Sequence, residues 1–175
     1  NNNSLLRIKS LIDKFPKAKF LLSFRNPLDH SISLLKQNIN FSNLQKKDKF
    51  AKKYMNYLVH HEFGLNHKPM IFKDLKKSAL EHNDVNYWLD QWINFYNFIK
   101  EEEFKTNPNI LFIDYEQLCK NTKFELKRIS NFIGEEMFDN IEDKHFSFKE
   151  YKSDEFYFDK TKIDQSIEIY NYLKS

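Results

Sequence analysis

Arg25 and Ser33 are the two residues whose types and spacing first suggest chemistry. They lie in the segment KFLLSFRNPLDHSIS, which runs from Lys19 to Ser33. A guanidinium can make two parallel charge-assisted hydrogen bonds to a phosphate-type anion. A hydroxyl eight residues farther along the chain could bind the same anion. The pair therefore indicates a site for a phosphate or a similar oxyanion.

A strand, a sharp corner and the start of a helix would position this pair. Residues 20–24 are almost wholly apolar, as in a buried central strand of a parallel sheet. Asn26 is a good N-cap and Pro27 suits the first helical position, so a helix is predicted over 27–37. Anions bind where the carboxyl end of a strand meets a helix N-terminus.

A purely structural role for both residues stays open. Arg25 could pair with Asp29 or Glu116 within the fold, and Ser33 could donate to the carbonyl of Asp29 in its own helix. The strand-corner-helix context and a second motif later in the chain favour the anion site.

That second motif is an apolar strand over 110–113, which ends at Asp114-Tyr115-Glu116. Thr122 and Glu125 then form a capping-box pattern at the start of a helix that Gly134 would close.

The remaining segments are predicted to be mostly helical, with helices over 4–15, 70–80, 83–103 and 161–173. A surface loop is predicted over 38–53, and it leads into a helix that ends near Gly64. Irregular structure is predicted over 135–160, packed through Phe138, Phe146, Phe148, Tyr151, Phe156 and Phe158. Strands separated by long helical crossovers predict a helix-rich α/β fold with a parallel sheet.

Length and composition set further limits. The 175 residues suit a single domain over 1–175, and a net charge of +3 does not suggest a nucleic-acid-binding protein. Cys119 is the single cysteine, which excludes an internal disulfide. The adjacent His60 and His61 would point about 100° apart on a helix and could not easily bind one ion, so no metal site is predicted. Two glycines leave no glycine-rich phosphate loop. With no apolar run long enough for a membrane span and no signal peptide, we expect a cytoplasmic protein.

The segment from Lys19 to Ser33 resembles the 3′-phosphate-binding segment of sulfotransferases that use 3′-phosphoadenosine 5′-phosphosulfate (PAPS). The family pattern is an apolar strand, then Arg-[Asp/Asn]-Pro, then Ser eight residues after the Arg. The sequence FPKAKF at 15–20 is similar to the entry found in bacterial, carbohydrate and protein-tyrosine members. The sequence NILFIDYEQL at 109–118 resembles the family's second strand and its Y-E-x-L continuation, and the helix ending in NFIG at Gly134 matches the family's next segment. The resemblance covers roughly residues 5–134.

This resemblance implies a function and a set of site residues. Arg25 and Ser33 would bind the 3′-phosphate of PAPS, the nucleotide co-substrate, and Tyr115 would lie beside the adenine. The reaction would transfer a sulfuryl group to an acceptor hydroxyl or amine. The family's lysine-containing phosphate loop and catalytic base would precede Asn1, and its late Arg-Lys-Gly motif is not visible here. We therefore expect the chain to be the C-terminal portion of a P-loop-like sulfotransferase domain. This portion would supply the half of the donor site that binds the 3′-phosphate, and it could be inactive as a fragment. The resemblance leaves the catalytic residues, the acceptor and the oligomeric state open.

Two other classes of function remain open at this point. A nucleotide-dependent phosphotransferase has the same general α/β plan and would use Asp114, at a strand end, to bind Mg²⁺. A non-catalytic helical interaction module would instead expose the apolar stripe from Trp88 to Ile99.

Overall fold

The computed structural model describes residues 6–72, 78–135, 147 and 150–175. Its backbone contacts divide the chain into two compact units, which we describe separately. The first comprises residues 1–26, 99–150 and 171–175, and the second comprises residues 27–98 and 151–170. No helix among the described residues is both long and apolar enough to cross a bilayer.

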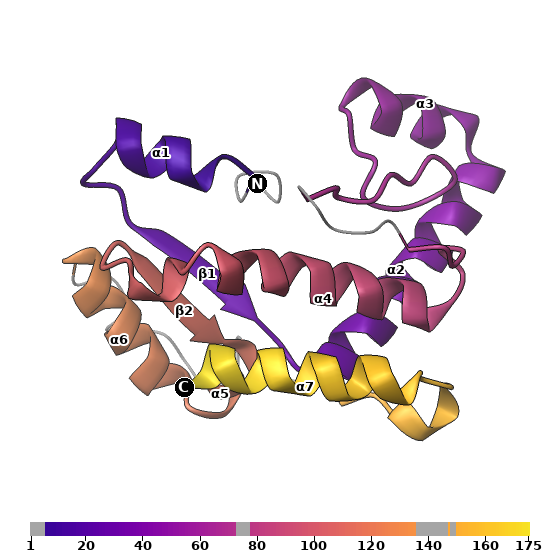
Figure 1. Ribbon diagram of the computed structural model, residues 1–175. Coiled ribbons are helices and arrows are strands. Elements are labelled where there is room, and N and C mark those ends of the chain that lie inside the picture. Colours follow the sequence, from indigo (N-terminus) through magenta and orange to yellow (C-terminus); the bar gives the residue numbers. More distant parts are fainter. Residues whose placement is uncertain (1–5, 73–77, 136–146, 148–149) are drawn as a thin grey trace. The chain divides into compact units, whose positions relative to one another are not determined.

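The first unit contains a parallel pair of strands, as the sequence predicts. Strand β1 (Phe20–Phe24) pairs with β2 (Ile110–Asp114), with Phe20 opposite Ile110 and Phe24 opposite Asp114 (Figure 1). Because the strands are parallel and in register, both carboxyl ends lie at the same edge of the sheet. The residues directly after each strand are thereby brought together.

Strand β1 is less buried than its apolar sequence predicts. Leu22 and Phe24 are buried, but Leu21 keeps 46% of its surface exposed and Ser23 is also exposed. Successive side chains of a strand point to opposite faces, and only one face of β1 is covered within the described part of the chain. The prediction of a central strand buried on both faces is therefore wrong for the described residues.

Helix α6 (Thr122–Ile133) packs against β2 and completes the core of this unit. Ile113 of β2 is buried against Leu126 and Ile129. Gly134 ends the helix with a φ of 83°, as predicted. The predicted capping box is absent, because the Thr122 hydroxyl donates to the Leu118 carbonyl.

Four short or partial elements complete the first unit. Helix α1 (Ile8–Lys14) confirms most of the helix predicted over 4–15, although residues 6–7 are 3₁₀-helical and Phe15 is not helical. Lys9 of α1 pairs with Glu102. The others are the 3₁₀ helix η2 (Phe104–Thr106), α5 (Tyr115–Lys120) and the last residues of α7 (Lys160–Lys174). Helix α5 was not predicted.

In the second unit, α2 (Pro27–Lys47) begins at the predicted residue but runs ten residues beyond its predicted end. The segment predicted as a loop over 38–53 is therefore mostly helical. Helix α3 (Lys49–Tyr57) comes directly after it, and the Asp48 carboxylate caps α3 by accepting from the amides of Phe50 and Ala51.

Helix α3 ends at Tyr57, so the prediction of a helix ending near Gly64 is also wrong. Residues 58–72 have no regular structure and are held on α2 by two buried amides. The Asn38 side chain accepts from the Gly64 amide at 2.8 Å, and the Gln45 side chain accepts from the Leu65 amide at 2.7 Å. Of the helix predicted over 70–80, residues 70–72 and 78–80 are not helical, and 73–77 lie outside the described residues.

Helices α4 (Val85–Glu101) and α7 confirm two predicted helices, and both span the boundary between the units. Within the second unit they are joined by an ion pair of 2.5 Å between Asp90 and Lys162. The side chains of Tyr151, Phe156 and Phe158 pack against the core of this unit as predicted, near the short helix η4 (Ser153–Glu155). Phe138, Phe146 and Phe148 lie outside the described residues.

Candidate functional site

Arg25 and Tyr115 meet at the carboxyl edge of the two-stranded sheet. Arg25 directly follows β1, and Tyr115 directly follows β2 as the first residue of α5. The guanidinium carbon of Arg25 lies 5.4 Å from the centre of the Tyr115 ring, which is within the range of a cation–π contact. Two of the three predicted site residues are therefore neighbours in the first unit.

Glu116 contacts both residues that directly follow β1, Arg25 and Asn26. Its residue surface is 8% exposed, and one carboxylate oxygen accepts a hydrogen bond from the Asn26 amide at 2.9 Å. The same oxygen lies 4.0 Å from Nε of Arg25. This contact supports the ion pair that the sequence left open as a structural role for Arg25. An arginine has five N–H donors, so a contact through Nε is compatible with an anion contact through the terminal nitrogens.

Asp114 fixes the turn from β2 into α5. One of its carboxylate oxygens accepts from the Glu116 amide at 2.9 Å and from the Gln117 amide at 3.3 Å, which caps the helix. Its other oxygen lies 3.8 Å from Nζ of Lys174, near the end of the chain. Asp114 thus has a structural role at the strand end, where the phosphotransferase alternative would need it for Mg²⁺.

The Tyr115 hydroxyl is protonated at neutral pH, as is usual for tyrosine, and its surroundings favour this form further. Burial raises the pKa of its hydroxyl, and a hydrogen bond with the Cys119 thiol adds to this effect. The hydroxyl also donates to the Ser147 carbonyl at 3.1 Å. The ring is consequently a neutral, partly anchored aromatic surface beside a cation, which suits stacking on a planar base.

Ser33 lies on α2 in the second unit and is half-buried. Its neighbour Ser31 is fully buried and donates to the Pro27 carbonyl at 2.7 Å, so the two serines have different environments. Convergence of Arg25 and Ser33 on one anion stays a prediction.

Sequence reasoning gave Glu116 only as a possible partner of Arg25 and missed Lys174. The signal for Glu116 is its position directly after the strand end that faces Arg25. Lys174 carries no such signal, because it lies far along the chain and is one of several lysines in a polar helix.

The apolar stripe of α4 is core rather than an exposed interaction surface. Trp88 is 3% exposed and Trp92 is 2% exposed, while Ile99 is fully buried. These values remove the observation on which the helical interaction module depended.

One of three comparisons with known proteins gave a match. The family model described as "Sulfotransferase domain" matches residues 4–173, nearly the whole chain. The searches of curated proteins and of solved structures gave no significant match. The matched range includes both strands of the small parallel sheet and Arg25, and it indicates a transferase domain with a helix-rich fold. The chain belongs to the sulfotransferase domain family.

Proposed function

We propose that this protein transfers a sulfuryl group from PAPS to an acceptor hydroxyl or amine, and that the described residues bind the 3′-phosphate end of the donor. In this reaction the acceptor oxygen or nitrogen forms a bond to sulfur. The bond between sulfur and the bridging phosphate oxygen breaks, and 3′,5′-adenosine bisphosphate leaves. No residue of the chain is assigned to the proton transfer.

The contact between Arg25 and Tyr115 is the observation that supports this proposal best. A cation and a neutral aromatic ring lie side by side where two parallel strands end. Ligands of open α/β sheets bind at this edge. A 3′-phosphorylated adenosine offers one phosphate for the guanidinium and one planar base for the ring, which matches the two groups in kind.

In the proposed site each residue has one task. The terminal nitrogens of Arg25 bind the 3′-phosphate through charge-assisted hydrogen bonds. The Ser33 hydroxyl donates to the same phosphate, and the Tyr115 ring packs beside the adenine. Glu116 holds the backbone of the corner through the Asn26 amide and orients Arg25 through Nε.

Calorimetric titration with 3′,5′-adenosine bisphosphate tests these assignments. Arg25→Ala should weaken binding by about 2–3 kcal/mol, the scale of a hydrogen bond to a charged group. Arg7→Ala is the matched control, because Arg7 is an exposed arginine in the same unit, and it should leave the affinity unchanged.

Adenosine 5′-monophosphate separates the 3′-phosphate contact from all others, since it lacks that phosphate. Arg25→Ala and Ser33→Ala should weaken binding of the bisphosphate but not of the monophosphate. Equal losses for both nucleotides would remove the 3′-phosphate from the proposal. Unchanged bisphosphate affinity in Arg25→Ala would reject Arg25 as a donor-binding residue.

Two finer expectations belong to the same proposal. They are that the fold is P-loop-like and that the chain resembles bacterial, carbohydrate and protein-tyrosine members most. A sulfuryl-transfer assay of the chain, alone and within any longer polypeptide that contains it, tests whether these residues suffice for activity.

A further inference from the structure

Helix α3 exposes the apolar side that an amphipathic helix normally buries. Phe50, Tyr54 and Tyr57 succeed one another at spacings of four and three residues and therefore share one face. Their exposed fractions are 72%, 52% and 74%, and the rings of Phe50 and Tyr54 stack at 5.8 Å. Ala51 and Met55, on another side, are half-buried, and the Met55 sulfur accepts a hydrogen bond from the Gln45 side chain of α2. The aromatic side consequently has no role in the core of its own unit.

The sequence around this aromatic face is rich in lysine. Residues 46–53 contain five lysines and one acidic residue, a larger positive charge than the net +3 of the whole chain. The acidic residue, Asp48, is engaged as the cap of α3. Nζ of Lys53 lies 5.8 Å from the centre of the Tyr57 ring, so a cation borders the aromatic stripe directly.

The turn after α3 continues the exposed apolar surface at an energetic cost. Val59 has a φ of 57°, and its amide donates to the Asn56 carbonyl while the His60 amide donates to the Met55 carbonyl. This is a Schellman motif, in which the left-handed position is usually glycine. A β-branched residue is strained there, yet Val59 is 67% exposed and stabilises no core. Strain without a folding benefit points to a role outside the fold.

We propose that the exposed side of residues 46–59, here called the α3 surface, docks on an anionic lipid bilayer. Phe50 offers only hydrocarbon, whereas the tyrosines offer a ring and a polar tip, the combination that favours the membrane interface. Lysines beside an aromatic helix face are the pattern of helices that lie in that interface. Helix α3 comes directly after α2 and lies at the end of α2 away from α4 (Figure 1).

Vesicle sedimentation of the whole chain tests the α3 surface. Binding should be clear with vesicles of about one-third phosphatidylserine in phosphatidylcholine and should be lost with phosphatidylcholine alone, because each lysine near an anionic surface contributes to binding. The double variant Phe50→Ser/Tyr57→Ser should lower the partition coefficient by at least about tenfold, as expected for the loss of two inserted rings. Lys49→Gln and Lys53→Gln should each lower it by about fivefold.

Phe124→Ser is the matched control. Phe124 is 69% exposed on α6, between the exposed Lys123 and Lys127, and it should not change vesicle binding. A similar loss in this variant, or equal binding to both kinds of vesicle, would overturn the proposal. Vesicle binding that persists in the Phe50/Tyr57 variant would do the same.

Hydrogen exchange gives a readout that does not depend on any variant folding. Anionic vesicles should protect the amides of residues 49–60 and leave those of 122–133 unchanged. Protection elsewhere but not at 49–60 rejects the α3 surface as the membrane contact. Competition by soluble polyglutamate without vesicle binding would instead assign the surface to an acidic protein, and concentration-dependent dimerisation abolished by Phe50→Ser/Tyr57→Ser would assign it to a second copy of this chain.

Discussion

Glu116 sets the charge balance of the sheet-edge corner at the scale of single residues. Its buried carboxylate accepts from the Asn26 amide and approaches Arg25, so it offsets part of the positive charge that a ligand would meet. Removing one member of a buried polar pair leaves the other without its partner and costs more than the pair contributed. In the proposed site Glu116 would therefore position Arg25, and removal of Glu116 would disturb the backbone of the corner as well as its charge.

Single residues of this site differ in how far the sequence could predict them. Arg25 and Tyr115 could be placed together, because parallel strands end at a common edge and each residue comes directly after a recognisable strand. The cap formed by Asp114 and its approach to Lys174 could not, since they depend on a tight turn into α5 and on a helix end sixty residues later. Periodicity contains no information about such side-chain contacts.

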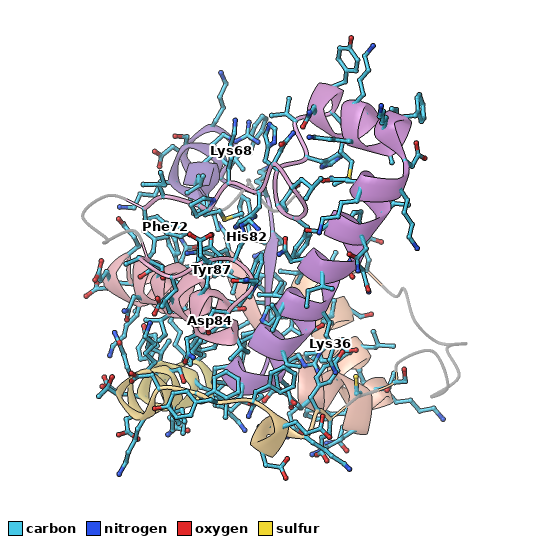
Figure 2. The ribbon with its side chains drawn as sticks, turned by 90° about the vertical axis from the view of Figure 1, so that its right-hand side faces the viewer. Lys36, Lys68, Phe72, His82, Asp84 and Tyr87 are labelled. Atoms are coloured by element: carbon cyan, nitrogen blue, oxygen red, sulfur yellow. The ribbon has the colours of Figure 1, made fainter. Side chains whose placement is uncertain are left out.

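His67 makes the stability of the second unit depend on pH. Nδ1 of His67 lies 2.8 Å from the Glu62 carbonyl, so this nitrogen donates, and Nε2 accepts from the Tyr87 hydroxyl at 2.6 Å. The rings of His67 and His82 pack edge-on. Figure 2 labels His82 and Tyr87, which both belong to the second unit. Burial lowers the pKa of His67 from its usual 6.5 and raises the pKa of Tyr87 to about 12.

A lowered pKa means that the unfolded chain binds a proton at His67 more readily than the folded chain does. The contribution of neutral His67 is complete above pH 6.5 and is lost as the pH falls through its lower folded pKa. Urea unfolding at about pH 7.5 and about pH 5.5 should therefore show lower stability in acid. His67→Gln should flatten this dependence, whereas His60→Gln, at an exposed position, should preserve it. An NMR titration that places the His67 pKa above 6.5 would contradict the argument.

At the scale of elements, α2 shows why the pattern of apolar residues underestimated a helix. Its buried side continues past Ile32 and Leu35, but the next buried residues are Asn38 and Gln45. The oxygens of these two side-chain amides accept from the Gly64 and Leu65 backbone amides, and their nitrogens donate to the His82 carbonyl and the Met55 sulfur. Burial therefore costs them little. A prediction from the pattern of apolar residues treats Asn38 and Gln45 as surface residues, and it therefore places the end of the helix too early.

The buried side-chain amide of Gln45 makes Gly64 sensitive to substitution, because the two lie in close contact where residues 58–72 pack on α2. Gly64 has a φ of 95°, and a Cβ there would meet the Gln45 side-chain oxygen at 2.5 Å. Gly134 has a φ of 83° but nothing within 4 Å, so it is a matched control for backbone strain alone. Gly134→Ala should lower the unfolding free energy by about 1 kcal/mol, the cost of an L-residue in the left-handed region.

Gly64→Ala should cost clearly more, by a further 1–3 kcal/mol or so, because it also displaces a hydrogen-bonded buried amide. Thermal or urea unfolding of the two variants measures the difference. The Gln45 contact would be unimportant if both substitutions had the same effect.

At the scale of the whole molecule, charge is unevenly distributed rather than large. The modest net charge of +3 hides the lysine-rich segment over 46–53, and the sheet-edge corner pairs Arg25 with Glu116 and Lys174 with Asp114. An overall charge therefore predicted neither feature. The family could be predicted from the sequence, because its motifs depend on local order and spacing, and the match over residues 4–173 confirms that prediction.

If the chain binds the proposed nucleotide, the ligand should stabilise the folded state by an amount that grows with the logarithm of its concentration over Kd. A ligand at about 100 times its Kd that binds only the folded state adds about 2.7 kcal/mol to the unfolding free energy. For a chain of this length, 3′,5′-adenosine bisphosphate should then raise the Tm by about 5–10 °C. In Arg25→Ala the predicted loss of 2–3 kcal/mol raises the Kd about 30–150-fold. The same nucleotide concentration would then contribute under about 1 kcal/mol, and most of the Tm shift should disappear.

Adenosine 5′-monophosphate at the same concentration is the control for this thermal measurement. If the 3′-phosphate supplies the contact with Arg25, the monophosphate should give only a small shift, and that shift should be equal in the unaltered chain and in Arg25→Ala. A large shift with the monophosphate would indicate that binding depends on the base and the 5′-phosphate. Arg25 would then serve the fold through Glu116, and its contact with the Tyr115 ring would be structural.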